Sequence, residues 1–291
     1  MTHHRYLQLD VFARRAGTGN PLGVVFDADS LDSSSMQAYA AWANLSETIF
    51  FLPPTTPAAD YRVRIFTPRQ ELPFAGHPSV GAAWAAMDAG LVDPGRQDLV
   101  QECGAGLLPV RVEARGTERV IHVRSPRATR LGSSESFPDA LRAATAGLCR
   151  GTLDPALWNN GPSWWLVPLA DEVTARTMLP DLSAIATLTA ASSAVGLAVF
   201  APTDAGEHHL VVRAFCPADG IPEDPVTGSA NACIAAMLQA AGAMPGEAGR
   251  YLASQGREMG RDGSVEVQLD PQGEVWIGGQ VQAVIRGAVD W

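Results

Sequence analysis

The sequence predicts an α/β protein made of two related halves, because one pattern of residues occurs twice in it. The first copy reads Phe66-Thr67-Pro68 and then His77-Pro78-Ser79-Val80-Gly81. The second copy reads Phe215-Cys216-Pro217 and then Asp224-Pro225-Val226-Thr227-Gly228. An alanine-rich apolar run follows each copy. A single repetition at about half the chain length indicates two similar domains rather than a solenoid, which needs three or more short units.

Each copy predicts the same succession of strand, loop and helix. Apolar and polar side chains alternate over residues 61–66 and 210–215, which predicts two strands. Helix-favouring apolar runs follow over residues 80–87 and 230–241. If the two halves face each other, the two loops meet, and His77 and Asp224 lie on opposite sides of a shared cleft.

The start of each predicted helix has the properties of an anion site. Pro78 and Pro225 suit the first turn of a helix, where no backbone N–H is needed. The free N–H groups and the helix dipole attract an anion, most simply a carboxylate. Small residues let a ligand approach the backbone closely, and here they include Gly76, Gly228 and Ser229. The alternative is two strand-to-helix turns that need Gly and Pro for shape alone, but two matching copies with ionisable residues favour a functional site.

The length and charge of the chain limit its function. Its 291 residues suit one large domain or two smaller ones, each with its own core. A net charge of −10 without a basic block argues against a nucleic-acid partner. Residues 182–203 lack charge but are rich in Ser and Thr, so we expect a helix and then a buried strand over 195–201, not a membrane span. With no apolar signal segment at its start, the chain is expected to be a cytoplasmic enzyme or binding protein.

The chain contains no lysine, and all 21 of its basic residues are arginine. A pyridoxal phosphate Schiff base and a P-loop both require lysine, so both are excluded. No glycine-rich dinucleotide motif follows a predicted strand. The four cysteines lack C-x-x-C spacing, which argues against structural zinc and against a disulfide framework. We therefore expect no metal and no cofactor, with the chemistry carried by side chains alone.

Glu47 is the strongest further candidate for catalysis, beside His77 and Asp224. It lies at the junction of a helix predicted over residues 34–43 and a strand over 49–52. A carboxyl group held among apolar neighbours has a raised pKa, which suits a general acid/base near neutral pH. On local sequence alone, a glutamate in a surface loop is the better explanation of Glu47.

Two further glutamates, Glu71 and Glu223, lie in the repeated loops. Each is interpreted in one of two ways. It binds substrate, or it caps a helix or pairs with an arginine such as Arg69 or Arg213.

Several segments in chain order resemble the PhzF family of phenazine biosynthesis-like proteins, and the resemblance covers nearly the whole chain. The segments are Leu9-Asp10-Val11-Phe12, Gly19-Asn20-Pro21, Asn44-Leu45-Ser46-Glu47-Thr48, Glu71-Leu72-Pro73-Phe74-Ala75-Gly76-His77-Pro78, Asn160-Gly161-Pro162, Glu223-Asp224-Pro225-Val226-Thr227-Gly228-Ser229-Ala230 and Gln255-Gly256-Arg257-Glu258-Met259-Gly260-Arg261. The resemblance implies a fold similar to diaminopimelate epimerase and proline racemase. Two pseudo-symmetric α/β halves each wrap a curved, mostly antiparallel sheet around a central helix, with the active site in the cleft between them.

The resemblance also assigns roles to residues. The family's catalytic positions fall on Glu47 as the acid/base, His77 and Asp224. Its substrate-binding positions fall on Gly228 and Ser229, which hold a carboxylate, with Ser46 and Gly76 nearby.

The resemblance implies a homodimeric isomerase without a cofactor. In the family's best-known member, a proton moves between ring carbons of trans-2,3-dihydro-3-hydroxyanthranilate. We therefore expect proton transfer within a small carboxylate-bearing substrate that is cyclic and unsaturated. An amino-acid racemase or epimerase, supported by fold alone, is an alternative, and a non-catalytic small-molecule binder is another. Racemisation is disfavoured because the epimerase relatives use two cysteines where this chain has His77 and Asp224.

The domain boundaries follow the repeat. A hydrophilic, turn-rich stretch over residues 124–135 separates the halves. We expect an N-terminal half over residues 1–124 and a C-terminal half over residues 125–281. The final strand, over residues 282–291, is expected to return to the first half.

Overall fold

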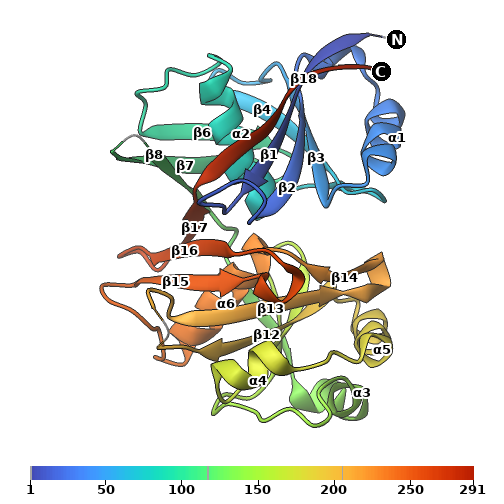
Figure 1. Ribbon diagram of the computed structural model, residues 1–291, viewed down its shortest axis with the longest axis vertical. Helices are drawn as coiled ribbons and strands as arrows, with labels where there is room; N and C mark the ends of the chain where they lie inside the picture. The colour runs from blue at the N-terminus through green and yellow to red at the C-terminus, as the bar shows by residue number, and fades with distance from the viewer. Residues whose placement is uncertain (1, 117, 205) are drawn as a thin grey trace. The chain divides into compact units, whose positions relative to one another are not determined.

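The computed structural model of the chain describes residues 2–116, 118–204 and 206–291. The chain divides into two compact units. The first unit comprises Met1–Arg124 together with Gly278–Trp291, and the second comprises Ser125–Ile277. The two ends of the chain lie together in the first unit, where the backbone N–H of Thr2 donates to the carbonyl of Trp291 over 2.8 Å (Figure 1).

The first unit wraps a mostly antiparallel sheet around one helix. Strand β1 pairs with β18 and β2, β3 with β4, β4 with β5, β6 with β7, and β7 with β8, all antiparallel. The pairs β2–β3 and β4–β6 are parallel. The elements are α1 (Ser33–Ala43), α2 (Gly76–Asp88), β1 (His3–Val11), β2 (Asn20–Val25), β3 (Glu47–Leu52), β4 (Tyr61–Phe66), β5 (Glu71–Leu72), β6 (Asp98–Cys103), β7 (Gly106–Arg115), β8 (Glu118–Arg124) and β18 (Val281–Asp290).

The second unit repeats this plan. Strand β10 pairs antiparallel with β9 and β11, β12 with β13, β13 with β14, and β15 with β16, whereas β11–β12 and β13–β15 are parallel. Strand β17 (Val275–Gly279) then leads back to the first unit. The other elements are α3 (Pro138–Ala144), α4 (Glu172–Thr177), α5 (Leu182–Ser192), α6 (Gly228–Ala240), β9 (Thr129–Ser133), β10 (Ala156–Asn159), β11 (Ser163–Pro168), β12 (Gly196–Pro202), β13 (Leu210–Cys216), β14 (Ile221–Asp224), β15 (Arg250–Gln255) and β16 (Gly263–Leu269).

The order of pairings confirms the predicted pseudo-symmetric α/β fold. From β1 to β7 the pairs run antiparallel, parallel, antiparallel, parallel, antiparallel, and the strands β10 to β16 follow the same order. Parallel strands need a crossover connection, and α1 and α5 provide it at matching points of the two units. The chain therefore builds one architecture twice.

Helices α2 and α6 are buried along most of their length. Helix α2 contacts β1, β2, β3, β4, β6, β8 and β18 (Figure 1). A helix enclosed on all sides must be apolar all round, and its residues must be small where strands pass close by. Gly81 illustrates this requirement, because a Cβ there would lie 2.4 Å from Cδ2 of Leu22 on β2. The burial of these two helices thus explains why their sequences are rich in alanine.

The predicted elements are confirmed, with adjusted ends. The strand predicted over 61–66 is β4, and the strand over 210–215 is β13, which extends to Cys216. Both central helices begin before the apolar runs that predicted them, at Gly76 and Gly228. Residues 182–203 form α5 and then β12, as expected. In the described part of the chain, no helix is long and apolar enough to cross a membrane.

A matched pair of arginine–glutamate contacts ties the repeated loop to its strand in each unit. Arg64 donates from Nε to Oε1 of Glu71 over 2.7 Å, and Arg213 donates from Nε and Nη2 to the two carboxylate oxygens of Glu223 over 2.9 Å each. Each guanidinium also lies 5.1 Å from the ring of a phenylalanine two residues further on. Pairing with an arginine, one of the two interpretations considered for Glu71 and Glu223, is therefore what the structure shows.

The two pairs differ in burial, and this predicts a difference in stability. The Arg213 side chain is 6% exposed and also donates to the carbonyls of Ala175 and Met178, whereas the Arg64 side chain is 21% exposed. Arg213→Met should lower the free energy of unfolding by about 3 kcal/mol or more, because it leaves a buried carboxylate behind. Arg64→Met should cost about 1 kcal/mol or less. Urea unfolding of both variants measures the two losses, and equal losses would contradict this explanation.

Candidate active site

Glu47 begins strand β3, three residues after Asn44, the residue that caps the end of helix α1. The helix ends because Asn44 adopts the left-handed conformation with φ of 51°, which an asparagine tolerates better than most residues. Glu47 then pairs with Leu22 of β2 in parallel register. Its side chain is 15% exposed, so the interpretation as a glutamate in a surface loop is wrong.

His77 is the second residue of helix α2, and only 4% of it is exposed. Its Nε2 atom lies 3.3 Å from Oε2 of Glu47. Burial lowers the pKa of His77 to about 3, although a hydrogen bond with the Pro21 backbone opposes this shift. At neutral pH the imidazole is therefore uncharged, and the structure brings two of the three predicted catalytic residues into contact.

The hydrogen bond with Pro21 fixes which nitrogen of His77 carries the proton. Proline has no backbone N–H, so its carbonyl accepts and the imidazole donates. Because Nε2 faces Glu47, Nδ1 is the donor, and Nε2 of the neutral ring presents a lone pair to the carboxyl group. A proton between Nε2 and Oε2 turns this contact into a hydrogen bond. The arrangement suits a carboxyl group that takes up and releases one proton.

The other predicted residues of the first unit lie beside this pair. Ser46 directly precedes Glu47, and Gly76 is the first residue of α2. The residue before the helix, Ala75, has no side chain that could cap it. In the first turn only Gly76 and His77 offer free N–H groups, because Pro78 has none.

In the second unit, Asp224 ends strand β14, and Gly228 and Ser229 begin helix α6. Thr227 precedes the helix but does not cap it with its side chain. Three N–H groups of the first turn, those of Gly228, Ser229 and Ala230, have no acceptor among the described residues. The tip of α6 therefore offers one more N–H group to an anion than the tip of α2.

The structure corrects the alignment of the two copies. The Pro-x-x-Gly pattern matches His77 with Asp224, but the helices match Gly76 with Gly228 and thus His77 with Ser229. The helix ends agree, because Leu91 donates to Ala86 as Ala243 donates to Leu238. Asp224 belongs to the strand before the helix. For the same reason, Pro225 does not lie in the first turn as expected, although Pro78 does.

Two residues that the sequence did not single out support the predicted site residues. One is Pro21, whose carbonyl holds His77. The other is Gln255, fully buried on β15, whose Oε1 accepts from the backbone N–H of Thr227 over 3.0 Å and whose Nε2 donates to the Asp224 carbonyl over 3.1 Å. Both residues lie in segments that carry the family resemblance, which is the signal that marks them.

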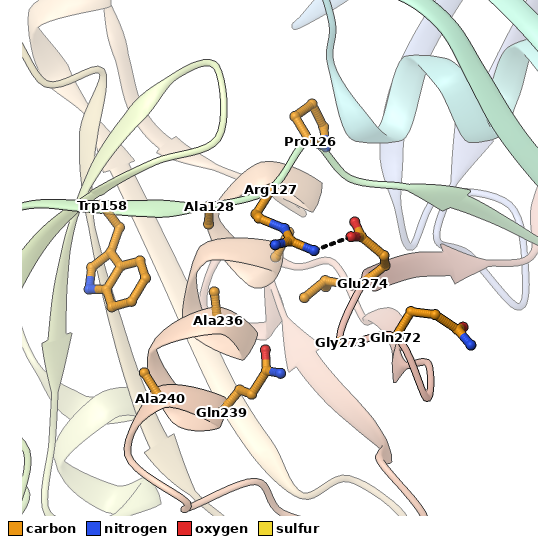
Figure 2. Close-up of a pocket in the computed structure, with 12 residues that line it drawn as sticks. Pro126, Arg127, Ala128, Trp158, Ala236, Gln239, Ala240, Gln272, Gly273 and Glu274 are labelled. Atoms are coloured by element: carbon orange, nitrogen blue, oxygen red, sulfur yellow. Dashed lines mark hydrogen bonds and ion pairs between the residues drawn. The ribbon is translucent and has the colours of Figure 1, made fainter.

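A pocket of about 450 Å³ lies elsewhere in the second unit, beside the later turns of α6 (Figure 2). Ala236 and Ala240 of α6 face it, and an ion pair between Arg127 and Glu274 spans its rim. None of the predicted site residues lines this pocket. Among the residues that the structure describes, no group of three or more His, Cys, Asp or Glu side chains is placed to hold a metal ion.

A family model described as phenazine biosynthesis-like protein matches residues 9–287. The chain belongs to this family. "Trans-2,3-dihydro-3-hydroxyanthranilate isomerase" of Pseudomonas aeruginosa is 35% identical over 93% of this chain and 92% of its own length. "Antisense-enhancing sequence 1" of Schizosaccharomyces pombe is 32% identical over 99% of both chains. Several other relatives in the family are named uncharacterized isomerases, and at this level of description the chain is an isomerase.

Solved structures agree with this membership of the phenazine biosynthesis-like family. The PhzF-family phenazine biosynthesis protein of Bacillus anthracis matches with a TM-score of 0.80 and 26% identity, over all of both chains. A hydroxyproline epimerase of Agrobacterium vitis matches with a TM-score of 0.71 over 99% of this chain and 92% of its own. At 14% identity, the second likeness shows the fold alone. It confirms the predicted epimerase-like architecture.

The neutral state of His77 predicts how stability depends on pH. The unfolded chain binds a proton at this imidazole below pH ~6.5, whereas the folded protein does so only near pH 3. Between these values the unfolded state holds more protons, so His77 lowers the free energy of unfolding by up to about 1.4 kcal/mol for each pH unit of acidification. Urea unfolding between pH 7 and pH 4.5 should therefore show a shallower decline for His77→Gln than for the wild type.

The same comparison in a Glu47→Gln background removes the titration of the neighbouring carboxyl group. Above pH 7, the free energies of unfolding of the proteins with and without His77→Gln should depend on pH in the same way. Parallel declines below pH 6 in both backgrounds would show that His77 is protonated in the folded state.

Proposed function

We propose that the protein is a cofactor-independent isomerase that moves a proton between two carbons of a small carboxylate-bearing substrate. The substrate is cyclic and unsaturated, either trans-2,3-dihydro-3-hydroxyanthranilate, which the Pseudomonas aeruginosa relative is named for, or an analogue of it. The observation that carries the proposal is the buried contact between Glu47 and His77, 3.3 Å apart. Family membership places this pair in a chain whose relatives are named isomerases.

In the proposed reaction, Glu47 is the group that moves the proton. Its carboxylate takes a proton from one carbon, the electron pair of that C–H bond shifts through the adjacent double bond, and the carboxyl group returns the proton to another carbon. No electrons enter or leave, so no redox partner is needed. His77, neutral and fixed by Pro21, offers Nε2 to the protonated carboxyl group and so stabilises the form of Glu47 that exists between the two transfers.

We assign the binding of the substrate carboxylate to the tip of α6. Its three free N–H groups and the positive end of the helix dipole point to an anion. The hydroxyl of Ser229 adds a further donor at the same place. Asp224, a hydrogen-bond acceptor on β14, is assigned to the binding of a polar substituent of the substrate. Ser46 and Gly76, which lie in the first unit, are assigned to substrate binding as well.

A racemase mechanism with two bases has less support. It needs a second acid/base group opposite the first, and the position in the second unit that matches Glu47 is occupied by Gly196. Incubation of L-amino acids in deuterated water tests this alternative, because racemisation labels the α-carbon. Label in any amino acid would favour the racemase over the isomerase.

Replacing Glu47 tests the proposed mechanism directly. Glu47→Gln keeps the shape of the side chain and removes the proton, so turnover of trans-2,3-dihydro-3-hydroxyanthranilate should fall by about 10²–10⁴-fold. Substrate affinity and the free energy of unfolding should change little. Glu71→Gln is the matched control, because this exposed glutamate pairs with Arg64 and should retain full activity. A Glu47→Gln enzyme with most of the wild-type rate would refute the mechanism, and a wild type that binds without turnover would indicate a binding protein.

The carboxylate site predicts a dependence on ligand charge. Gly228→Val places a branched side chain at the first residue of α6, next to the free N–H groups. Affinity for anthranilate should fall by about 2 kcal/mol, comparable to one or two charge-assisted hydrogen bonds. The uncharged anthranilamide should bind the wild type weakly and lose much less on mutation. Calorimetric titration of both ligands measures this, and equal losses would mean that the loop contributes shape alone.

A further inference from the structure

A tryptophan that no sequence motif marked contacts Ser229 in the proposed carboxylate site. The indole Nε1 of Trp164, on β11, donates to Oγ of Ser229 over 3.1 Å. Both residues are buried, with 3% of Trp164 and 9% of Ser229 exposed. The contact lies wholly within the second unit.

This hydrogen bond decides what the Ser229 hydroxyl can do. An indole N–H can only donate, so Oγ is the acceptor and its own hydrogen points elsewhere. Among the described residues, that hydroxyl donates to no protein acceptor. Serines near a helix start commonly donate back to the preceding turn, as Ser79 of α2 does to the Ala75 carbonyl over 2.9 Å. In Ser229, the hydrogen is instead available to a ligand beside the free N–H groups of α6.

The fold makes room for the indole with a glycine. Gly196 begins β12 and pairs with Trp164 in parallel register. A Cβ at Gly196 would lie 2.5 Å from the Trp164 ring and 2.6 Å from the Phe215 carbonyl oxygen, so no larger residue fits. In this unit, glycine is therefore required for the tryptophan to reach Ser229.

The same position in the first unit holds Glu47. Each strand starts three residues after a helix cap in the left-handed conformation, Asn44 with φ of 51° and Ser193 with φ of 53°. Glu47 pairs with Leu22 as Gly196 pairs with Trp164. Where the first unit presents an acid/base carboxyl group to the tip of its central helix, the second unit presents an indole N–H.

We propose that Trp164 is a positioning residue for capture of the substrate carboxylate, which it assists by holding the Ser229 hydroxyl as a donor. The inference rests on the proposed function, because it assumes that a carboxylate binds at the tip of α6. Trp164 does not touch the substrate; it acts through Ser229.

The next residue in the chain, Trp165, provides a matched control. Trp165 is fully buried and donates from Nε1 to Oγ of Ser192 over 2.9 Å, at the far end of helix α5. Trp164→Phe and Trp165→Phe each remove one indole–serine hydrogen bond and keep an aromatic ring. Any general effect of such a loss on folding is therefore common to both variants, whereas only Trp164→Phe alters Ser229.

The experiment is a calorimetric titration with anthranilate and anthranilamide. For Trp164→Phe we expect affinity for anthranilate to fall about five- to tenfold, the effect of one hydrogen bond, and affinity for anthranilamide to stay within about twofold. For Trp165→Phe both affinities should stay within about twofold of the wild type. Ser229→Ala should weaken anthranilate binding at least as much as Trp164→Phe, and the double variant should bind like Ser229→Ala alone.

The outcomes separate this inference from the proposed function. If the wild type prefers anthranilate to anthranilamide and Trp164→Phe keeps that preference, the role of Trp164 is refuted while the carboxylate site stands. Additive losses in the double variant, or equal losses in the two tryptophan variants, refute it as well. If the wild type itself shows no preference for the acid, the carboxylate site and the role of Trp164 both fall, whereas loss of turnover in Glu47→Gln still tests the proton transfer.

Discussion

Each unit depends on a helix that is shielded from water along nearly its whole length. Burial forces α2 and α6 to be built from small apolar residues, and no side chain of the residue before either helix caps the N–H groups of the first turn. An N–H group that has no acceptor in the chain is satisfied by water or by a ligand. Each buried helix therefore ends in a first turn whose N–H groups are available to a ligand.

The two units share one scaffold, but their central helices begin with different residues. At the tip of α2, Pro78 removes an N–H group, and His77 lies against the carboxyl group of Glu47. At the tip of α6, Ala230 supplies the third N–H group, and Ser229 stands where His77 stands. The first tip thus suits proton transfer and the second suits the binding of an anion, and these are the two roles that the proposed reaction requires.

The sequence predicted the fold well because its signals are local. Alternation found β4, the alanine runs found both central helices, and the duplicated pattern implied two halves. The residue-by-residue alignment of the two repeated copies, which matches His77 with Ser229, was not predictable in the same way. It depends on the pairing of β14 with β13 just before α6, where Asp224 pairs with Ala214 next to an irregularity in the register. Strand pairing joins residues that are distant in the sequence, so local patterns do not reveal it. Contacts such as Trp164 with Ser229 likewise join residues far apart in the chain, and no spacing rule reveals them.

The tip of α6 is open because its natural cap is engaged elsewhere. A threonine before a helix normally accepts from an N–H of the first turn. Here Oγ1 of Thr227 donates to Asp224 and accepts from Nε2 of Gln255 over 2.9 Å. Oε1 of Gln255 in turn accepts from Asn231 over 3.1 Å, so both ends of this buried amide are satisfied. The network therefore joins Thr227, Asp224 and Gln255 directly before the first turn of α6. For the proposed carboxylate site, such a frame would keep the substrate anion and the Asp224 side chain from moving toward each other.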